Sequence, residues 1–181
     1  MRAIQQIETK ENFNTIKTDA LERIKEDKYK YECLAILIGL DTGLRASDLL
    51  RLKTINISQN PLTHKYECLA DIKKTGVKNH KTLISTDTYN AFKRFKIETP
   101  YIFTNPQTER LYTRIWLSKR TKMRYGFSFH TLRKISATFI LNGSTLVDAQ
   151  RHLAHKRISS TDRYLSVTER DSLDRIAHLY R

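Results

Sequence analysis

The sequence predicts a single α+β domain, mainly α-helical with a small antiparallel β-sheet. Three observations predict this class: apolar residues recur at helical spacing through most of the chain, one segment alternates apolar and polar residues, and only five Gly and three Pro interrupt the 181 residues. A chain of this length can bury a real core as one compact domain.

The first half opens with helices. Apolar residues at helical spacing predict helices over residues 9–26 and 29–40, and a third over 44–52. The break between the last two is Asp41-Thr42-Gly43, a polar turn that contains glycine.

The middle of the chain predicts a β-hairpin or meander. Residues 66–72 alternate apolar and polar side chains, and Thr75-Gly76 separates them from a second run at 82–84. Side chains alternate faces along a strand, so Lys74 continues the face of the apolar residues whereas Lys73 points the other way.

Helical spacing returns after Thr86. It predicts helices near 112–124, 131–141 and 145–153, after a short strand at 101–103. Asn142-Gly143 provides a helix stop. Two segments resemble capping boxes that open the following helices: Thr145-x-x-Asp148 and Thr168-x-x-Asp171.

The formal charge of +14, from 33 Lys and Arg against 19 Asp and Glu, predicts a polyanionic partner, with nucleic acid favoured. No long apolar run and no signal-peptide pattern is present, so we expect a cytoplasmic or nucleoid-associated protein without membrane contact. Cys33 and Cys68 have neither disulfide nor zinc-ribbon spacing and are expected to be buried thiols.

Metal and cofactor chemistry is not expected. The nearest approach to a pair of metal ligands is His152 with His155, and no third Cys, His or carboxylate lies near them in the sequence. Breaking a phosphodiester without a metal needs a nucleophile, cationic donors for the non-bridging oxygens, and a proton donor for the departing oxygen.

Three segments carry residues of these kinds. Arg45 follows a glycine turn at the head of a helix, a natural anion site, although taken alone this pattern favours a solvated arginine or a partner of Asp48. His130 and Arg133 are three residues apart, hence on one helical face. Tyr164 follows His155 by nine residues, and taken singly it would be an ordinary half-buried tyrosine.

In combination these residues resemble the tyrosine recombinase, or phage integrase, family. The resemblance covers residues 29 to about 180 and runs, in the family's order, through Thr42-Gly43-Leu44-Arg45, Lys74-Thr75-Gly76-x-Lys78, His130-x-x-Arg133, Leu153-x-His155 and Tyr164-Leu165.

The resemblance implies a site-specific recombinase or integrase that cleaves and rejoins DNA through a 3′-phosphotyrosyl intermediate, without metal or ATP. Tyr164 would be the nucleophile and Lys74 the proton donor to the departing 5′-oxygen. Arg45, Arg133 and His155 are implied to bind the scissile phosphate, and His130 to accept or relay the proton of Tyr164.

Neighbouring residues have supporting roles in this interpretation. Lys73 and Lys78 compete with Lys74 for the acid role and otherwise bind DNA together with Lys134. Asp48 occupies a position where the family often has an acidic residue behind the first arginine, so its substitution should have a milder effect.

The family's usual N-terminal helical domain is not expected in this chain, because Arg45 comes too early. The chain, 1–181, is then a single catalytic domain, either excised or from a short natural member. Residues 168–181 predict a final amphipathic helix, which could pack on its own domain. The resemblance implies instead that it docks on a neighbouring subunit of a homo-tetramer on double-stranded DNA, while the isolated domain can be a monomer.

Two other functions fit part of the pattern. A type IB topoisomerase shares the chemistry, although His-x-x-Arg and the compact size favour a recombinase. A basic DNA-binding module could use the same Arg, His and Tyr side chains to contact phosphate without cleaving it.

Overall fold

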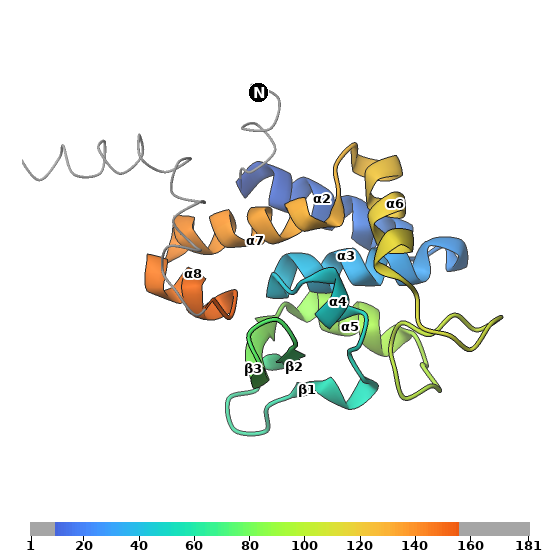
Figure 1. Cartoon of the computed structure of the whole chain (residues 1–181), viewed down its shortest axis with the longest axis horizontal. Helices are drawn as coiled ribbons and strands as arrows, with labels where there is room; N and C mark the ends of the chain where they lie inside the picture. The colour runs from blue at the N-terminus through green and yellow to red at the C-terminus, as the bar shows by residue number, and fades with distance from the viewer. Residues whose placement is uncertain (1–9, 156–181) are drawn as a thin grey trace, which may run out of the picture.

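A computed structural model of the chain describes residues 10–155, with side chains from Asn12 onward (Figure 1). Its elements, in chain order, are α2 (Lys10–Arg23), η1 (Asp27–Tyr29), α3 (Lys30–Thr42), α4 (Ala46–Leu49), η2 (Thr54–Asn56), β1 (Ile57–Gln59), β2 (Tyr66–Ile72), β3 (Val77–Ile84), α5 (Thr86–Arg94), α6 (Arg114–Tyr125), α7 (Phe129–Gly143) and α8 (Leu146–His152). Tyr164, the Thr168-x-x-Asp171 box and the predicted helix over 168–181 lie outside the described residues. The mainly helical α+β class is confirmed.

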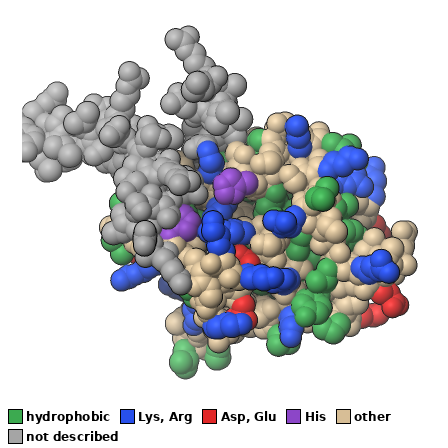
Figure 2. Space-filling model, in the orientation of Figure 1, with side chains coloured by type: hydrophobic (Ala, Val, Ile, Leu, Met, Phe, Trp, Pro, Cys, Tyr) green, Lys and Arg blue, Asp and Glu red, His purple; other side chains and the backbone are tan. Residues whose placement is uncertain are grey.

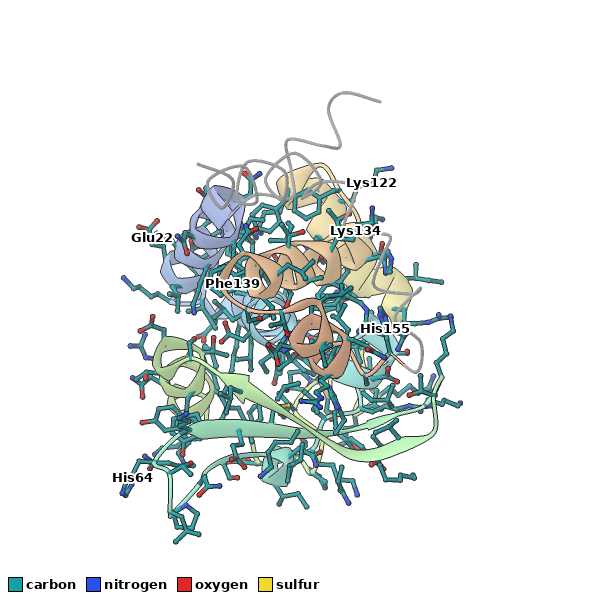
Figure 3. All side chains as sticks on the ribbon, turned by 90° about the vertical axis from the view of Figure 1, so that its left-hand side faces the viewer. Glu22, His64, Lys122, Lys134, Phe139 and His155 are labelled. Carbon is teal, nitrogen blue, oxygen red and sulfur yellow. The ribbon has the colours of Figure 1, made fainter. Side chains whose placement is uncertain are left out.

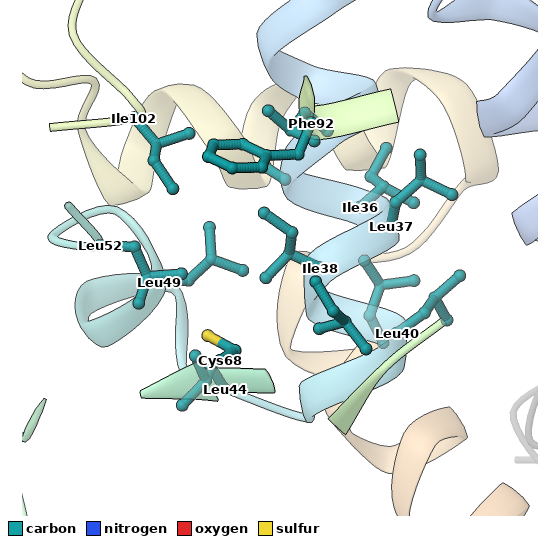
Figure 4. Close-up of a cluster of buried hydrophobic side chains, with 14 of the residues drawn as sticks. Ile36, Leu37, Ile38, Leu40, Leu44, Leu49, Leu52, Cys68, Phe92 and Ile102 are labelled. Atoms are coloured by element: carbon teal, nitrogen blue, oxygen red, sulfur yellow. The ribbon is translucent and has the colours of Figure 1, made fainter. Parts of the chain in front are cut away.

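Helix α3 forms the centre of the core. Its residues from Glu32 to Leu40 are all buried, as expected for a helix that is apolar on every face. Helices α2 and α7 pack on one side of it, and the sheet and α5 lie on the other (Figure 1). Figure 4 shows its Ile36, Leu37, Ile38 and Leu40 among side chains from α4, β2 and α5.

The sheet is a three-stranded antiparallel meander in the order β1-β2-β3. The predicted alternation is confirmed, because Cys68, Ala70 and Ile72 of β2 face the core. The register between β2 and β3 shifts between Ala70 and Ile72, just before the turn that contains Lys74. This irregularity lies where the hairpin leaves the body of the molecule.

Two predicted elements were wrong. The helix expected over 44–52 extends only over α4, because Arg45 has extended backbone angles as its N-cap and Leu50 already caps its end. The strand expected at 101–103 does not form: Tyr101 makes one isolated bridge, to Lys53. Ile102 N–H donates to the Leu52 carbonyl. The segment therefore makes isolated hydrogen bonds to a neighbouring stretch of irregular backbone and not the ladder of a strand.

The predicted helix ends around the site are confirmed. Helix α7 ends at Gly143. The capping box of α8 is present, with Thr145 Oγ1 accepting from Asp148 N–H while the Asp148 carboxylate accepts from Thr145 N–H. Cys33 and Cys68 are buried free thiols, and burial raises the pKa of each to about 12.

Candidate active site

The turn after α3 presents Arg45. Thr42 Oγ1 donates to the Ile38 carbonyl (2.6 Å) and accepts from Leu44 N–H (3.3 Å), which fixes the end of the helix. Gly43 then adopts a left-handed conformation, φ 60°, that glycine enters without steric cost. Arg45 follows as the N-cap of α4. Its Nη1 atom is buried and has no hydrogen-bond partner among the described residues.

Gly43 also allows this turn to lie directly against α7 and the end of α8. A Cβ at this position would come within 2.7 Å of Leu153 Cδ2 and 3.1 Å of Ser136 Oγ. The glycine therefore sets the distance between Arg45 and the two helices that carry the other predicted phosphate ligands.

Arg133, from the interior of α7, is only 3% exposed. Its guanidinium donates to the Gly43 carbonyl (2.5 Å) and to the Leu153 carbonyl (2.8 Å), and Nη2 lies 2.8 Å from Nε2 of His155. A single buried arginine thus joins the Arg45 turn to the segment after α8. These contacts fix the guanidinium before any ligand is present.

His155 follows Ala154, which has a left-handed backbone with φ 50°. The backbone N–H of His155 donates to the Gln150 carbonyl (3.0 Å), and Gln150 Nε2 donates to the backbone carbonyl of His155 (3.1 Å). The backbone of His155 is therefore hydrogen-bonded to α8. Burial, together with the charges of Arg133, Arg45 and Lys74, lowers the pKa of His155 to about 4. The imidazole is therefore neutral at neutral pH.

His130 lies in the first turn of α7 and keeps an exposed edge. Partial burial lowers its pKa, and the charges of Arg133, Lys134, Arg45 and Lys74 act in the same direction. Lys134 also lies on α7, on the same side of the molecule as His155 (Figure 3). His130 is thus surrounded by cations and stays available to accept a proton.

Some of the predicted site residues line a common pocket of about 260 Å³. It is lined by Arg45, His130 and Arg133 together with residues that the sequence did not single out, among them Ser47, Arg114 and Ser118. Arg114 is the first residue of α6, and the only sequence signal near it is Thr113, which caps that helix. Lys and Arg side chains, with histidines among them, are spread over the face shown in Figure 2.

Lys74 lies in the exposed turn between β2 and β3, which Gly76 closes with φ 70° and an N–H bond to the Ile72 carbonyl (2.9 Å). The charge of Lys74 contributes to the lowered pKa of both His130 and His155, so this lysine interacts electrostatically with both histidines of the site. Lys73 and Lys78 instead line a separate pocket of about 620 Å³, and Lys78 pairs with Asp71 (3.1 Å).

Asp48 is buried and contacts the lysine turn. Its Oδ1 accepts from the backbone N–H of Lys73 (3.3 Å), whereas its Oδ2 has no hydrogen-bond partner in the described part of the chain. Within residues 10–155 there is no ion pair between Asp48 and Arg45. The contact found therefore links Asp48 to the hairpin.

In residues 10–155, no three His, Cys, Asp or Glu side chains gather as metal ligands would. In the same range, no helix combines the length and apolar character that crossing a membrane requires.

This helix-rich fold with its small antiparallel sheet is that of the tyrosine recombinase catalytic domains. The chain belongs to the phage integrase family, whose sequence model matches residues 8–170. No curated protein sequence matched it.

Three solved structures illustrate the likeness. XerH site-specific recombinase bound to difH substrate, in a pre-cleavage complex, is 20% identical with a TM-score of 0.71, and the match covers 86% of this chain and 49% of XerH. XerA recombinase is 15% identical with a TM-score of 0.69, covering 89% and 61%. A lambda integrase dimer bound to a COC′ core site is 21% identical with a TM-score of 0.63, covering 86% and 46%. The match thus spans about half of the length of these proteins.

Proposed function

We propose that this chain is the catalytic part of a site-specific DNA recombinase that cleaves and rejoins strands through a phosphotyrosyl bond to Tyr164. The observation that carries the proposal is the pair of arginines at one pocket: Arg45 has a buried donor without a partner, and Arg133 is fixed beside it by carbonyls. A phosphodiester supplies the acceptor oxygens that such a site lacks.

The two arginines stabilise the transition state. When the nucleophile attacks, negative charge grows on the non-bridging oxygens of the phosphorus, and forked N–H donors already in place oppose it without reorganisation. His155 is neutral, and because its Nε2 accepts from Arg133, its ring hydrogen lies on Nδ1; we assign this N–H as its donor to the phosphate.

Tyr164 supplies the nucleophile. A phenol with the ordinary pKa of about 10 is only ~0.1% ionised at neutral pH, so a cationic pocket that favours the phenolate increases the reactive fraction. His130 accepts the phenolic proton, which is consistent with the lowered pKa that keeps its imidazole neutral.

Lys74 protonates the departing oxygen. The phenolate oxygen of Tyr164 bonds to phosphorus, the bond from phosphorus to the 5′-oxygen breaks, and that oxygen takes the proton from the Lys74 ammonium. The electrostatic effect of Lys74 on His130 and His155 supports this choice over Lys73 and Lys78, which line the other pocket. Those two lysines and Lys134 then bind the DNA backbone.

The covalent bond conserves the energy of the phosphodiester, so rejoining requires neither ATP nor a metal ion. The partner in this proposal is double-stranded DNA that carries a specific site, on which four copies assemble. The net charge of +14 supports a DNA partner.

The test is covalent capture. The full chain is incubated with a pool of nicked DNA duplexes in which the region around the nick is randomised, and protein–DNA adducts that survive denaturant are sequenced. We expect enrichment of one site, adducts in the presence of EDTA, and none with Tyr164→Phe. Equal adduct formation by Tyr164→Phe would overturn the proposal.

The captured site then separates the rival functions. Exchange of strands between two sites identifies a recombinase, and relaxation of a supercoiled plasmid at one site identifies a topoisomerase. A DNA-binding module would shift the mobility of the same DNA and form no adduct.

A further inference from the structure

His80 joins the hairpin to the end of α8. It lies on β3 opposite Ala70 of β2, and its side chain is partly buried. His80 Nε2 lies 2.9 Å from the His152 carbonyl oxygen. A carbonyl only accepts, so the histidine donates. The contact connects segments 72 residues apart in the sequence.

His152 is itself fixed. Its Nε2 lies 3.0 Å from Ser136 Oγ, one helical turn beyond Arg133 on α7. A Cβ on Gly43 would lie 3.3 Å from the same nitrogen, so the ring also packs against the Arg45 turn. The next carbonyl, that of Leu153, accepts from Arg133. The carbonyl that accepts from His80 therefore belongs to the segment that contacts both Arg133 and the Arg45 turn.

The hairpin turn needs such an attachment. Lys73, Lys74 and Gly76 are exposed, and beyond Ala70 and His80 the register of the two strands shifts. Among the described residues, a second link from this turn to the body of the molecule is the 3.3 Å hydrogen bond that Lys73 N–H donates to the Asp48 carboxylate. That bond fixes the β2 side of the turn, and His80 fixes the β3 side.

We propose that His80 is a positioning residue for Lys74: its hydrogen bond to the His152 carbonyl holds the hairpin at the distance from Arg133 and His155 that proton transfer to the departing 5′-oxygen requires. The inference rests on the proposed function. His80 touches neither the DNA nor the reacting atoms in this account and acts only through Lys74.

The experiment compares two forms of the captured site that differ in one atom. In one, the scissile phosphate has its ordinary 5′-bridging oxygen, and in the other a sulfur replaces it. A thiol has a pKa of about 8.5 and departs as thiolate, so it needs little help from a general acid. A defect in protonating the leaving group disappears with sulfur, whereas a defect in phosphate binding or nucleophile activation persists.

The variants are His80→Leu, which keeps bulk but cannot donate, and His80→Gln, whose amide N–H can reach the same carbonyl. Lys74→Ala is the reference for a lost general acid, and His64→Asn, in the exposed β1–β2 loop, is the matched control. General acids contribute about 10²–10⁴-fold, so we expect a displaced one to slow cleavage of the oxygen substrate about ten-fold.

The expected pattern for His80→Leu is slow cleavage of the oxygen substrate, cleavage of the sulfur substrate within about two-fold of the unsubstituted chain, and restoration by His80→Gln. Equal slowing on both substrates, or no slowing on either, would refute the positioning role while leaving the proposed function intact. Absence of adducts with the unsubstituted chain on both substrates would remove the proposed function, and the role of His80 with it. Urea unfolding of each variant at equal pH separates loss of stability from loss of rate.

Discussion

Arg133 Nη2 and His155 Nε2 lie 2.8 Å apart, and this approach defines the protonation state of the site. Arginine has only donors, so the imidazole nitrogen accepts and the ring proton lies on Nδ1. The guanidinium therefore occupies one ring nitrogen of the histidine, and its charge adds to the burial that lowers the pKa of His155 to about 4.

The two arginines should respond differently to substitution. Arg45→Ala removes a guanidinium whose Nη1 has no partner, so stability should stay the same or rise while cleavage falls by about 10²–10³-fold. Arg133→Ala should reduce both, because Gly43 and Leu153 lose their buried donor. Single-turnover cleavage and urea unfolding measure the two effects. Arg94→Ala, an exposed arginine in the last turn of α5, is the control, and a stability loss for Arg45→Ala equal to that of Arg133→Ala would contradict the assignment.

Stability should fall in mild acid because of His152. Burial lowers the pKa of this histidine to about 4, with smaller contributions from His80 and Arg133. The unfolded chain titrates near 6.5, so below that pH it binds protons more readily than the folded chain, and stability is lost as the pH falls towards 4. Between pH 7 and pH 5 we expect a loss of about 2 kcal/mol from this residue.

Urea unfolding at the two pH values tests this. His152→Gln should lower stability at pH 7 but make the pH dependence less steep, leaving the part due to His155, whereas His64→Asn should leave the slope unchanged. If the stability of His152→Gln depended on pH as steeply as that of the unsubstituted chain, groups other than His152 would cause the loss of stability in acid.

Gly43→Ala should destabilise the domain by about 2 kcal/mol or more, since a methyl group meets Leu153 at 2.7 Å and the left-handed backbone opposes any side chain. Gly143 is the matched control, because nothing lies within 4 Å of a Cβ there and its φ is ordinary. Gly143→Ala should raise stability by about 0.5–1 kcal/mol. Thermal unfolding of both variants tests this prediction, and we expect the change in stability to have opposite signs in the two.

Ala154 occupies a left-handed conformation just before His155. Glycine has no steric cost there, so Ala154→Gly should change stability by no more than about 0.5 kcal/mol, while Ala149→Gly, inside α8, should cost about 1 kcal/mol. Ala154→Val should cost about 2 kcal/mol and slow cleavage, because a β-branched residue forces this turn open. Tolerance of valine in both unfolding and cleavage assays would show that the turn does not position His155.

The sequence predicted the helices that carry the site because their signals are local. The Thr42-Gly43 stop, the periodicity of α7 and the capping box at Thr145 each depend on residues within a turn of one another. The facing of β2 followed from alternation in the same way. His130 and Arg133 consequently appear on one helix, as predicted.

What the sequence did not reveal are contacts between distant segments. The Arg133 bond to Gly43 spans 90 residues and the His80 bond to His152 spans 72, and no local pattern marks either. Arg114 lines the pocket only because α6 begins there. The segment at 101–103 has strand-like composition, but the residues beside it form no strand for it to join.

The unpartnered Nη1 of Arg45 means that the empty protein stores free energy at the place where a phosphate is proposed to bind. A buried donor without an acceptor costs about 1–3 kcal/mol, which any suitably placed phosphate oxygen restores. This gain is the same for every base sequence. It would strengthen binding to every duplex equally, so target choice would have to come from contacts that differ between one site and the next.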